Sequence, residues 1–116
     1  MHRRRPVVGT TGATNEVAAN TFGAVPVGTW SFVVAIHDAT TDVLKISVNN
    51  GAFDSVAHTT DIRDLDGVFR FNGHAPEAGV AFDGRLDSVV FAKKVFSADD
   101  LTWLYNAGFG RQCSEL

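Results

Sequence analysis

The sequence predicts an all-β fold, an antiparallel β-sandwich with one short helix near the C-terminus. Short segments of alternating apolar and polar residues follow one another at regular intervals, and turns rich in Gly, Asn, Asp and Thr separate them. Nine Phe and two Trp against one Met favour a β-rich interior. A chain of 116 residues corresponds to one domain.

The N-terminal quarter predicts little regular structure. Residues 1–14 form an irregular lead-in with a short strand at residues 6–8. Residues 16–27 hold one strand that Gly23 and Pro26 interrupt. Because proline has no N–H to donate, Pro26 fits an edge or a strand start.

The clearest strand follows Gly28, and a polar turn at residues 37–42 leads from it to a second strand over residues 43–49. The residues predicted to share the buried face of the first strand are Trp30, Phe32, Val34 and Ile36. Those predicted to point inward from the second are Leu44, Ile46 and Val48. The chain turns again at residues 49–51, and weaker strands are predicted at residues 52–60, 68–73 and 79–83.

The last third predicts a turn, a strand and a capped helix. Asp83 and Gly84 tolerate a positive φ and predict a hairpin turn before a strand over residues 85–91. Asp87 would share a face with apolar neighbours, so its carboxylate needs partners; we favour backbone N–H groups over a metal. Ser97 is a predicted N-cap for a helix over residues 98–106, which Gly108 ends.

The order of these parts resembles a laminin-G-like domain of the concanavalin A-like lectin/glucanase class. Gly28-Thr29-Trp30 before a strand, an Asn–Gly turn after the next strand, and a Ser cap before a helix ending in Leu-Tyr carry the resemblance, which covers residues 25–110. It implies a jelly-roll sandwich over residues 15–111, with residues 112–116 as a tail. Family domains are longer, so the chain would be a C-terminal portion or a minimal version.

The resemblance also implies a non-catalytic carbohydrate-binding or adhesion module whose partner is a glycan or polysaccharide. Flat aromatic rings stack on sugars, and planar polar groups bond their hydroxyls. The residues predicted to supply such groups at strand ends are Phe53, Arg70, Asn72 and His74. Each of the four histidines lacks ligand spacing, so we expect all of them to be polar surface residues, and both Trp to lie in the core.

Calcium is the one cofactor that the resemblance suggests. Asp61, Asp64 and Asp66 form the densest acidic loop, and hard carboxylate oxygens suit this ion. The alternative, which we favour, is a solvated loop whose Asp side chains cap nearby backbone N–H groups.

Several functions are disfavoured by what the sequence lacks. The three glutamates are isolated from any Glu-x-Asp-x-Glu strand, so we expect no enzyme. A net charge of −3 gives no footprint for nucleic acid, and no segment is long and apolar enough to span a membrane. Residues 6–14 are too polar for a signal peptide, although an extracellular or virion-associated location fits the resemblance.

Self-association is the last expectation. Few strands precede Gly28, so sheet edges and apolar faces should remain open and form a homo-oligomer, with Val90 near the uncovered region. The alternative function is therefore a structural assembly protein, for example of a phage or virion, in which the small sandwich serves oligomerisation. Residues 104–111 resemble endings of laminin-G-like domains in phage proteins.

Overall fold

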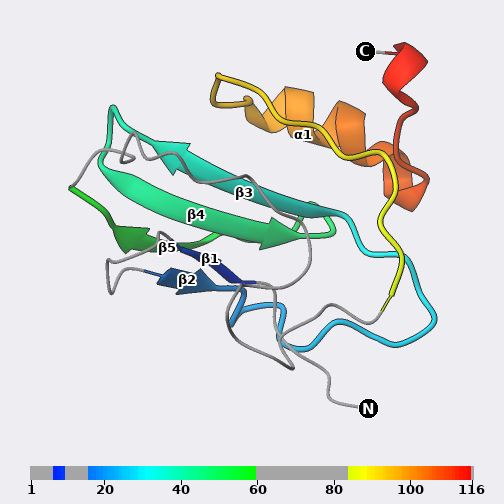
Figure 1. Cartoon of the computed structure of the whole chain (residues 1–116), viewed down its shortest axis with the longest axis horizontal. Helices are drawn as coiled ribbons and strands as arrows, with labels where there is room; N and C mark the ends of the chain where they lie inside the picture. Colours follow the sequence, from blue (N-terminus) through cyan, green and yellow to red (C-terminus); the bar gives the residue numbers. More distant parts are fainter. Residues whose placement is uncertain (1–6, 10–15, 60–83, 116) are drawn as a thin grey trace, which may run out of the picture.

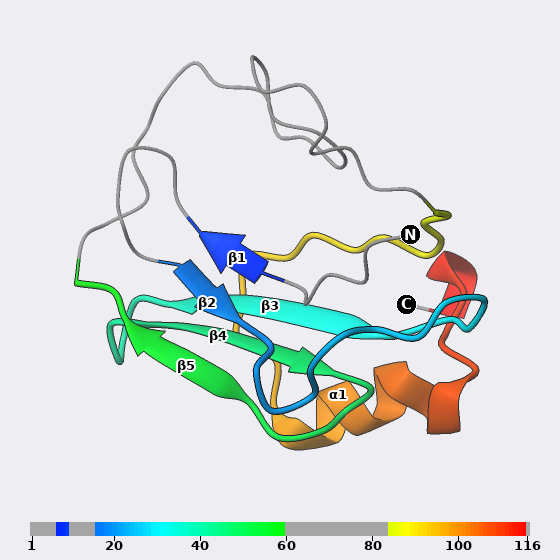
Figure 2. The ribbon, with the colours of Figure 1, turned by 90° about the horizontal axis from the view of Figure 1, so that it is seen from below.

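The computed structural model describes residues 7–9, 16–59 and 84–115 and arranges them in three layers (Figures 1 and 2). One layer is a hairpin of β1 (Val7–Gly9) and β2 (Glu16–Ala18). The middle layer is an antiparallel sheet in the order β3 (Val33–Asp38), β4 (Val43–Val48), β5 (Asp54–Ala57). The third is α1 (Ala98–Tyr105), followed by the 3₁₀ turns η1 (Asn106–Gly108) and η2 (Cys113–Glu115).

Turn chemistry fixes the register of the sheet. Asn49 and Asn50 both adopt a left-handed conformation, with φ of 53° and 56°, at the predicted turn between β4 and β5. Between β3 and β4, the Asp38 carboxylate accepts hydrogen bonds from the backbone N–H groups of Thr40 and Thr41. Ala35 therefore lies opposite Ile46, and Leu44 lies opposite Val56.

The buried core lies between the hairpin and one face of β4. Leu44, Ile46 and Val48 are buried there, as the alternation predicts, and they pack with Val17 and Ala19 from the β2 region. These side chains point to the same face because strand residues alternate with a period of two. β4 is therefore the strand around which the molecule is organised.

The opposite face of the sheet carries α1 (Figure 2). Val34 and Ile36 are half-buried on this face, so the prediction that they share a face with Phe32 agrees with the register. The Phe32 and Tyr105 rings lie 5.7 Å apart, and the Asn50 side-chain amide donates to the Thr102 hydroxyl at 3.2 Å.

The prediction that Trp30 is buried is wrong, because its side chain is 62% exposed. The ladder begins only at Val33, since the Phe32 N–H donates to the Asn49 side chain instead of a ladder partner. Trp30 therefore precedes the sheet and shares no strand face with Ile36.

The predicted strand over residues 85–91 does not form. Ser88 adopts φ 51°, which breaks the alternation, and its N–H donates to the Asp87 carboxylate at 2.7 Å. Asp87 is thus exposed and not on a buried apolar face, although its partner is a backbone N–H, the kind we favoured. The strands predicted at residues 68–73 and 79–83 lie outside the described residues. The described residues form a mostly β fold with one short α-helix.

The predicted helix cap is confirmed. The Ser97 hydroxyl accepts from the Asp100 N–H at 3.1 Å, and the Asp100 carboxylate accepts from the Ser97 N–H at 3.0 Å, forming a capping box. The helix ends two residues earlier than Gly108, at Asn106, which takes the left-handed conformation with φ 48°.

The expectation that every histidine is a polar surface residue is wrong for His58, which is 1% exposed. The backbone N–H of His58 donates to the Asp42 carbonyl at 2.7 Å, which holds this residue against the β3–β4 turn. The His58 ring lies 5.1 Å from the His37 ring. His2 and His74 lie outside the described residues.

The core assignment predicts the stability of two variants. Ile46→Ala should lower the free energy of unfolding by about 2–5 kcal/mol because it leaves a cavity among buried side chains. Trp30→Ala should change it by no more than ~0.5 kcal/mol, since an exposed side chain loses little packing. Urea denaturation measures both, and equal losses would contradict the placement of Trp30 outside the core.

The capping box predicts a second stability effect. Ser97→Ala should cost about 0.5–2 kcal/mol, measured by urea denaturation at neutral pH. The N–H and hydroxyl of Ser97, helped by Lys94, hold the pKa of Asp100 below its ordinary value of 3.8. This contribution is present above pH 3.8 and is lost as the pH falls through the lower folded-state pKa.

The pH dependence can be assigned with one variant. Asp100→Asn removes the carboxylate of the capping box and should flatten the loss of stability in acid. If the free energy of unfolding fell equally with pH in the wild type and in Asp100→Asn, the capping box would not be the source of the loss of stability in acid.

Candidate functional site

Of the four residues predicted to bind a sugar, the structure describes only Phe53. Its ring is exposed in the segment that leads into β5, as a surface role requires. The other three, Arg70, Asn72 and His74, lie outside the described residues. So do Asp61, Asp64 and Asp66, the predicted calcium ligands, and the described part of the chain contains no cluster of three or more His, Cys, Asp or Glu that could hold a metal.

A shallow hollow of about 370 Å³ lies beside α1, within the size range of small-molecule sites. Its surface is mainly apolar. The residues that line it are Phe96, Asp99, Asp100, Trp103 and Leu104.

Helix geometry gathers four of these residues on one side of α1. Trp103 follows Asp99 by four positions, and Leu104 follows Asp100 by four, which places each pair on adjacent turns of one face. Phe96 comes just before the Ser97 cap, so the capping box also fixes where the chain enters the hollow.

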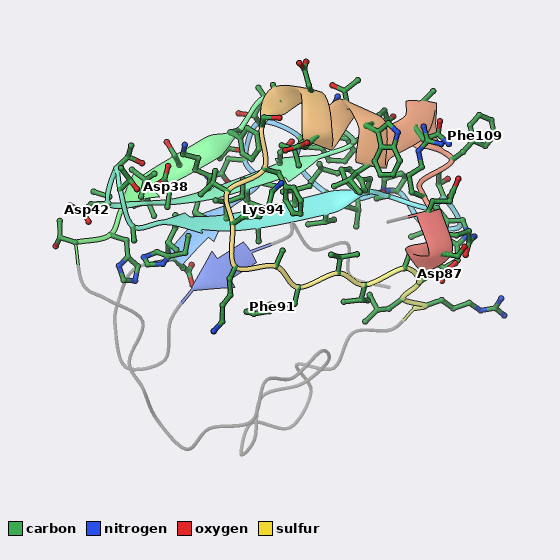
Figure 3. All side chains as sticks on the ribbon, turned by 90° about the horizontal axis from the view of Figure 1, so that it is seen from above. Asp38, Asp42, Asp87, Phe91, Lys94 and Phe109 are labelled. Carbon is green, nitrogen blue, oxygen red and sulfur yellow. The ribbon has the colours of Figure 1, made fainter. Side chains whose placement is uncertain are left out.

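A cation contacts two of the residues that line the hollow. The Lys94 ammonium lies 4.9 Å from the centre of the Phe96 ring and 3.5 Å from the Asp100 carboxylate (Figure 3). Asp100 is therefore engaged by both the cap and Lys94. The Asp99 carboxylate has no such partner among the described residues and faces solvent.

A C-terminal clamp holds Trp103. The Arg111 guanidinium lies 4.5 Å from the centre of an indole ring, and its Nε donates to the Trp103 carbonyl at 3.0 Å. Glu115 lies 3.6 Å from the same guanidinium and also accepts from the Gln112 N–H. Because Arg111 does not line the hollow, it fixes the indole without filling the site.

The arrangement suits a ring with an apolar face and hydroxyls at its edge. Trp103 and Phe96 offer aromatic surface, and the free carboxylate of Asp99 accepts hydrogen bonds from hydroxyl groups. A pyranose combines both features.

The sequence analysis missed this site because it placed both Trp in the core, and Trp103 is 44% exposed. The spacing Asp99, Asp100, Trp103 after an N-cap was a usable signal, since it puts two acids and an aromatic on one helical face. On the same helix, Leu101 is buried, and Leu104 and Tyr105 are half-buried.

The model of the family described as the concanavalin A-like lectin/glucanases superfamily matches residues 4–102. No curated protein and no solved structure matches the chain. Over the described residues, the helices are too short and too polar to cross a bilayer.

The clamp predicts a spectroscopic change. In a Trp30→Phe background, where Trp103 is the only indole, Arg111→Ala should increase quenching of the fluorescence by acrylamide, because the guanidinium no longer covers and holds the ring. Arg111→Lys should act in the same direction, since an ammonium cannot stack as a plane. Arg85→Ala, on an exposed side chain elsewhere, is the control; an unchanged quenching constant in both Arg111 variants would contradict the clamp.

Proposed function

Since this chain belongs to the concanavalin A-like lectin/glucanases superfamily, we propose that it is a non-catalytic carbohydrate-binding or adhesion module. The observation that supports this most is the hollow beside α1, with an exposed indole fixed by Arg111 and the exposed carboxylate of Asp99 at its side. A site this shallow would recognise one or two sugar units of a longer glycan.

The state of Asp100 supports binding over hydrolysis. A glycosidase needs a general acid whose pKa is raised, paired with a second carboxylate across the scissile bond. Asp100 has the opposite environment, since hydrogen bonds from Ser97 and the charge of Lys94 lower its pKa. Asp99 and Asp100 are also adjacent on one helical turn, so they do not face each other across a substrate.

The sugar-binding and calcium-binding residues predicted from the sequence extend this proposal. Phe53, Arg70, Asn72 and His74 would form a second sugar-contacting surface, and calcium bound by Asp61, Asp64 and Asp66 would order the loop beside it. Both depend on residues outside the described part of the chain, so glycan binding should be measured with calcium and with a chelator.

A structural assembly role is the second candidate. The observation that favours it is the row of exposed apolar side chains on the segment before α1, which includes Val90 and Phe91. Such a row is typical of a surface that meets another chain.

Glycan-array binding tests the first proposal, with Trp103→Ala against wild type. We expect Trp103→Ala to lower affinity for the bound glycan about tenfold or more, because stacking on the indole is lost. Trp30→Ala removes an exposed Trp away from the hollow and should bind as wild type does. Full binding by a folded Trp103→Ala variant would exclude the hollow as the site, and an array without any bound glycan would overturn the proposed function.

A further inference from the structure

We propose that the hollow beside α1 prefers a sugar unit that carries an ammonium group, such as glucosamine, over the same unit with an acetamide or a hydroxyl in its place. This inference rests on the proposed function, because it names the class of sugar that the same hollow takes. Two observations support it: the way in which the chain's own Lys94 contacts the lining, and the charge that the lining carries.

Lys94 shows how an ammonium group binds to residues of this hollow. Its Nζ lies 4.9 Å from the centre of the Phe96 ring and 3.5 Å from the Asp100 carboxylate, and both of these residues line the hollow. The ring supplies a cation–π contact and the carboxylate an ion pair, so two lining side chains contact one ammonium at the same time. An aromatic ring with a carboxylate beside it is thus a combination that takes a primary ammonium in this protein.

Trp103 and Asp99 form a second pair of the same kind. They are four positions apart on α1, which places their Cβ atoms about 5–6 Å apart on one face of the helix. Both side chains line the hollow, and both are exposed. At this spacing, an ammonium within about 6 Å of the indole centre also reaches ion-pair distance from the carboxylate. A ligand from solution can therefore contact this pair as Lys94 contacts the first one.

The charges around the hollow favour a cationic ligand. Lys94 balances the charge of Asp100, and Glu115, 3.6 Å from the Arg111 guanidinium, balances the cation that stacks on the indole. The charge of the lining that remains is the Asp99 carboxylate, which makes the hollow net negative. Because the surface around this carboxylate is mainly apolar, the local dielectric constant is lower than in water and an ammonium is attracted more strongly.

A glucosamine unit presents the two groups that this pair requires. Its pyranose ring has a face of C–H groups that stacks on the indole, and its amine sits at the edge of that face, on the carbon next to the anomeric carbon. N-acetylglucosamine carries a neutral acetamide at this carbon. Glucose carries a hydroxyl, which donates a hydrogen bond to a carboxylate but forms no ion pair. The three sugars differ at this one carbon, so their comparison isolates the ammonium.

Calorimetric titration of the full chain with three matched tetramers tests the preference. The tetramers are β-linked chains of glucosamine, of N-acetylglucosamine and of glucose, and the titration is made at about pH 6, where the carboxylates are ionised and an amine is protonated. The glucosamine tetramer should bind about fivefold or more tightly than either neutral tetramer, because an ion pair and a cation–π contact add to the same stacking. Sodium chloride should reduce this ratio, since it screens the charges.

Three variants test which residues carry the preference, and the readout is the ratio of the glucosamine affinity to the N-acetylglucosamine affinity. Asp99→Asn should bring this ratio close to one. Lys94→Gln releases the Phe96–Asp100 pair for a ligand and should raise the ratio. Asp42→Asn removes one exposed carboxylate at the β3–β4 turn, apart from Lys94 and α1 (Figure 3), and should leave the ratio as in the wild type. Circular dichroism confirms that each variant is folded.

The outcomes that overturn this inference differ from those that overturn the proposed function. Equal affinities for the three tetramers, lowered together by Trp103→Ala, would overturn the ammonium preference and leave the proposed function standing. Equal losses of glucosamine binding in Asp99→Asn and Asp42→Asn would also overturn it, because they would show attraction to the net charge of the chain. A glucosamine tetramer that does not bind overturns the preference alone, whereas a glycan array without any bound glycan overturns both.

Discussion

The burial of one face of β4 against the β1–β2 hairpin is the interaction on which the rest of the structure depends. Leu44, Ile46 and Val48 are each almost fully excluded from water, and the residues that cover them, Val17 and Ala19, come from a distant part of the sequence. Burying side chains of this size is worth about 1.5–3 kcal/mol each, which exceeds what a hairpin or a short helix gains on its own. The sheet thereby becomes a platform with a second face available for α1.

The helix layer is held in a different way, by polar devices at its ends. An eight-residue helix is marginal in isolation, so the Ser97–Asp100 box, the Asn50–Thr102 hydrogen bond and the buried Leu101 together keep it in place. The same devices create the candidate site, because they fix the face that carries Asp99 and Trp103. Stability and proposed recognition therefore share one short segment, and Arg111 connects that segment to the C-terminal residues.

Local signals in the sequence predicted local structure well. The inward residues of β4, the Asn49–Asn50 turn and the Ser97 cap were all predictable, because each depends on neighbours within about four positions and on strong residue preferences. The predictions of burial or exposure that were wrong share another feature. Trp30, His58 and Trp103 were assigned as exposed or buried from residue type, whereas each outcome depends on where a strand begins or how the chain returns to the sheet.

The sequence by itself thus determined the superfamily, the mostly β class, the central strand and the capped helix, since alternation and capping act at short range. Only the tertiary structure decided which aromatic side chains stay at the surface. The Asn49 side chain takes the Phe32 N–H and leaves Trp30 outside the sheet, and the return of Arg111 onto Trp103 fixes an exposed indole. The residues in these contacts stand 17 and 8 positions apart, and such distances are closed by the packing of the whole chain, not by local preference.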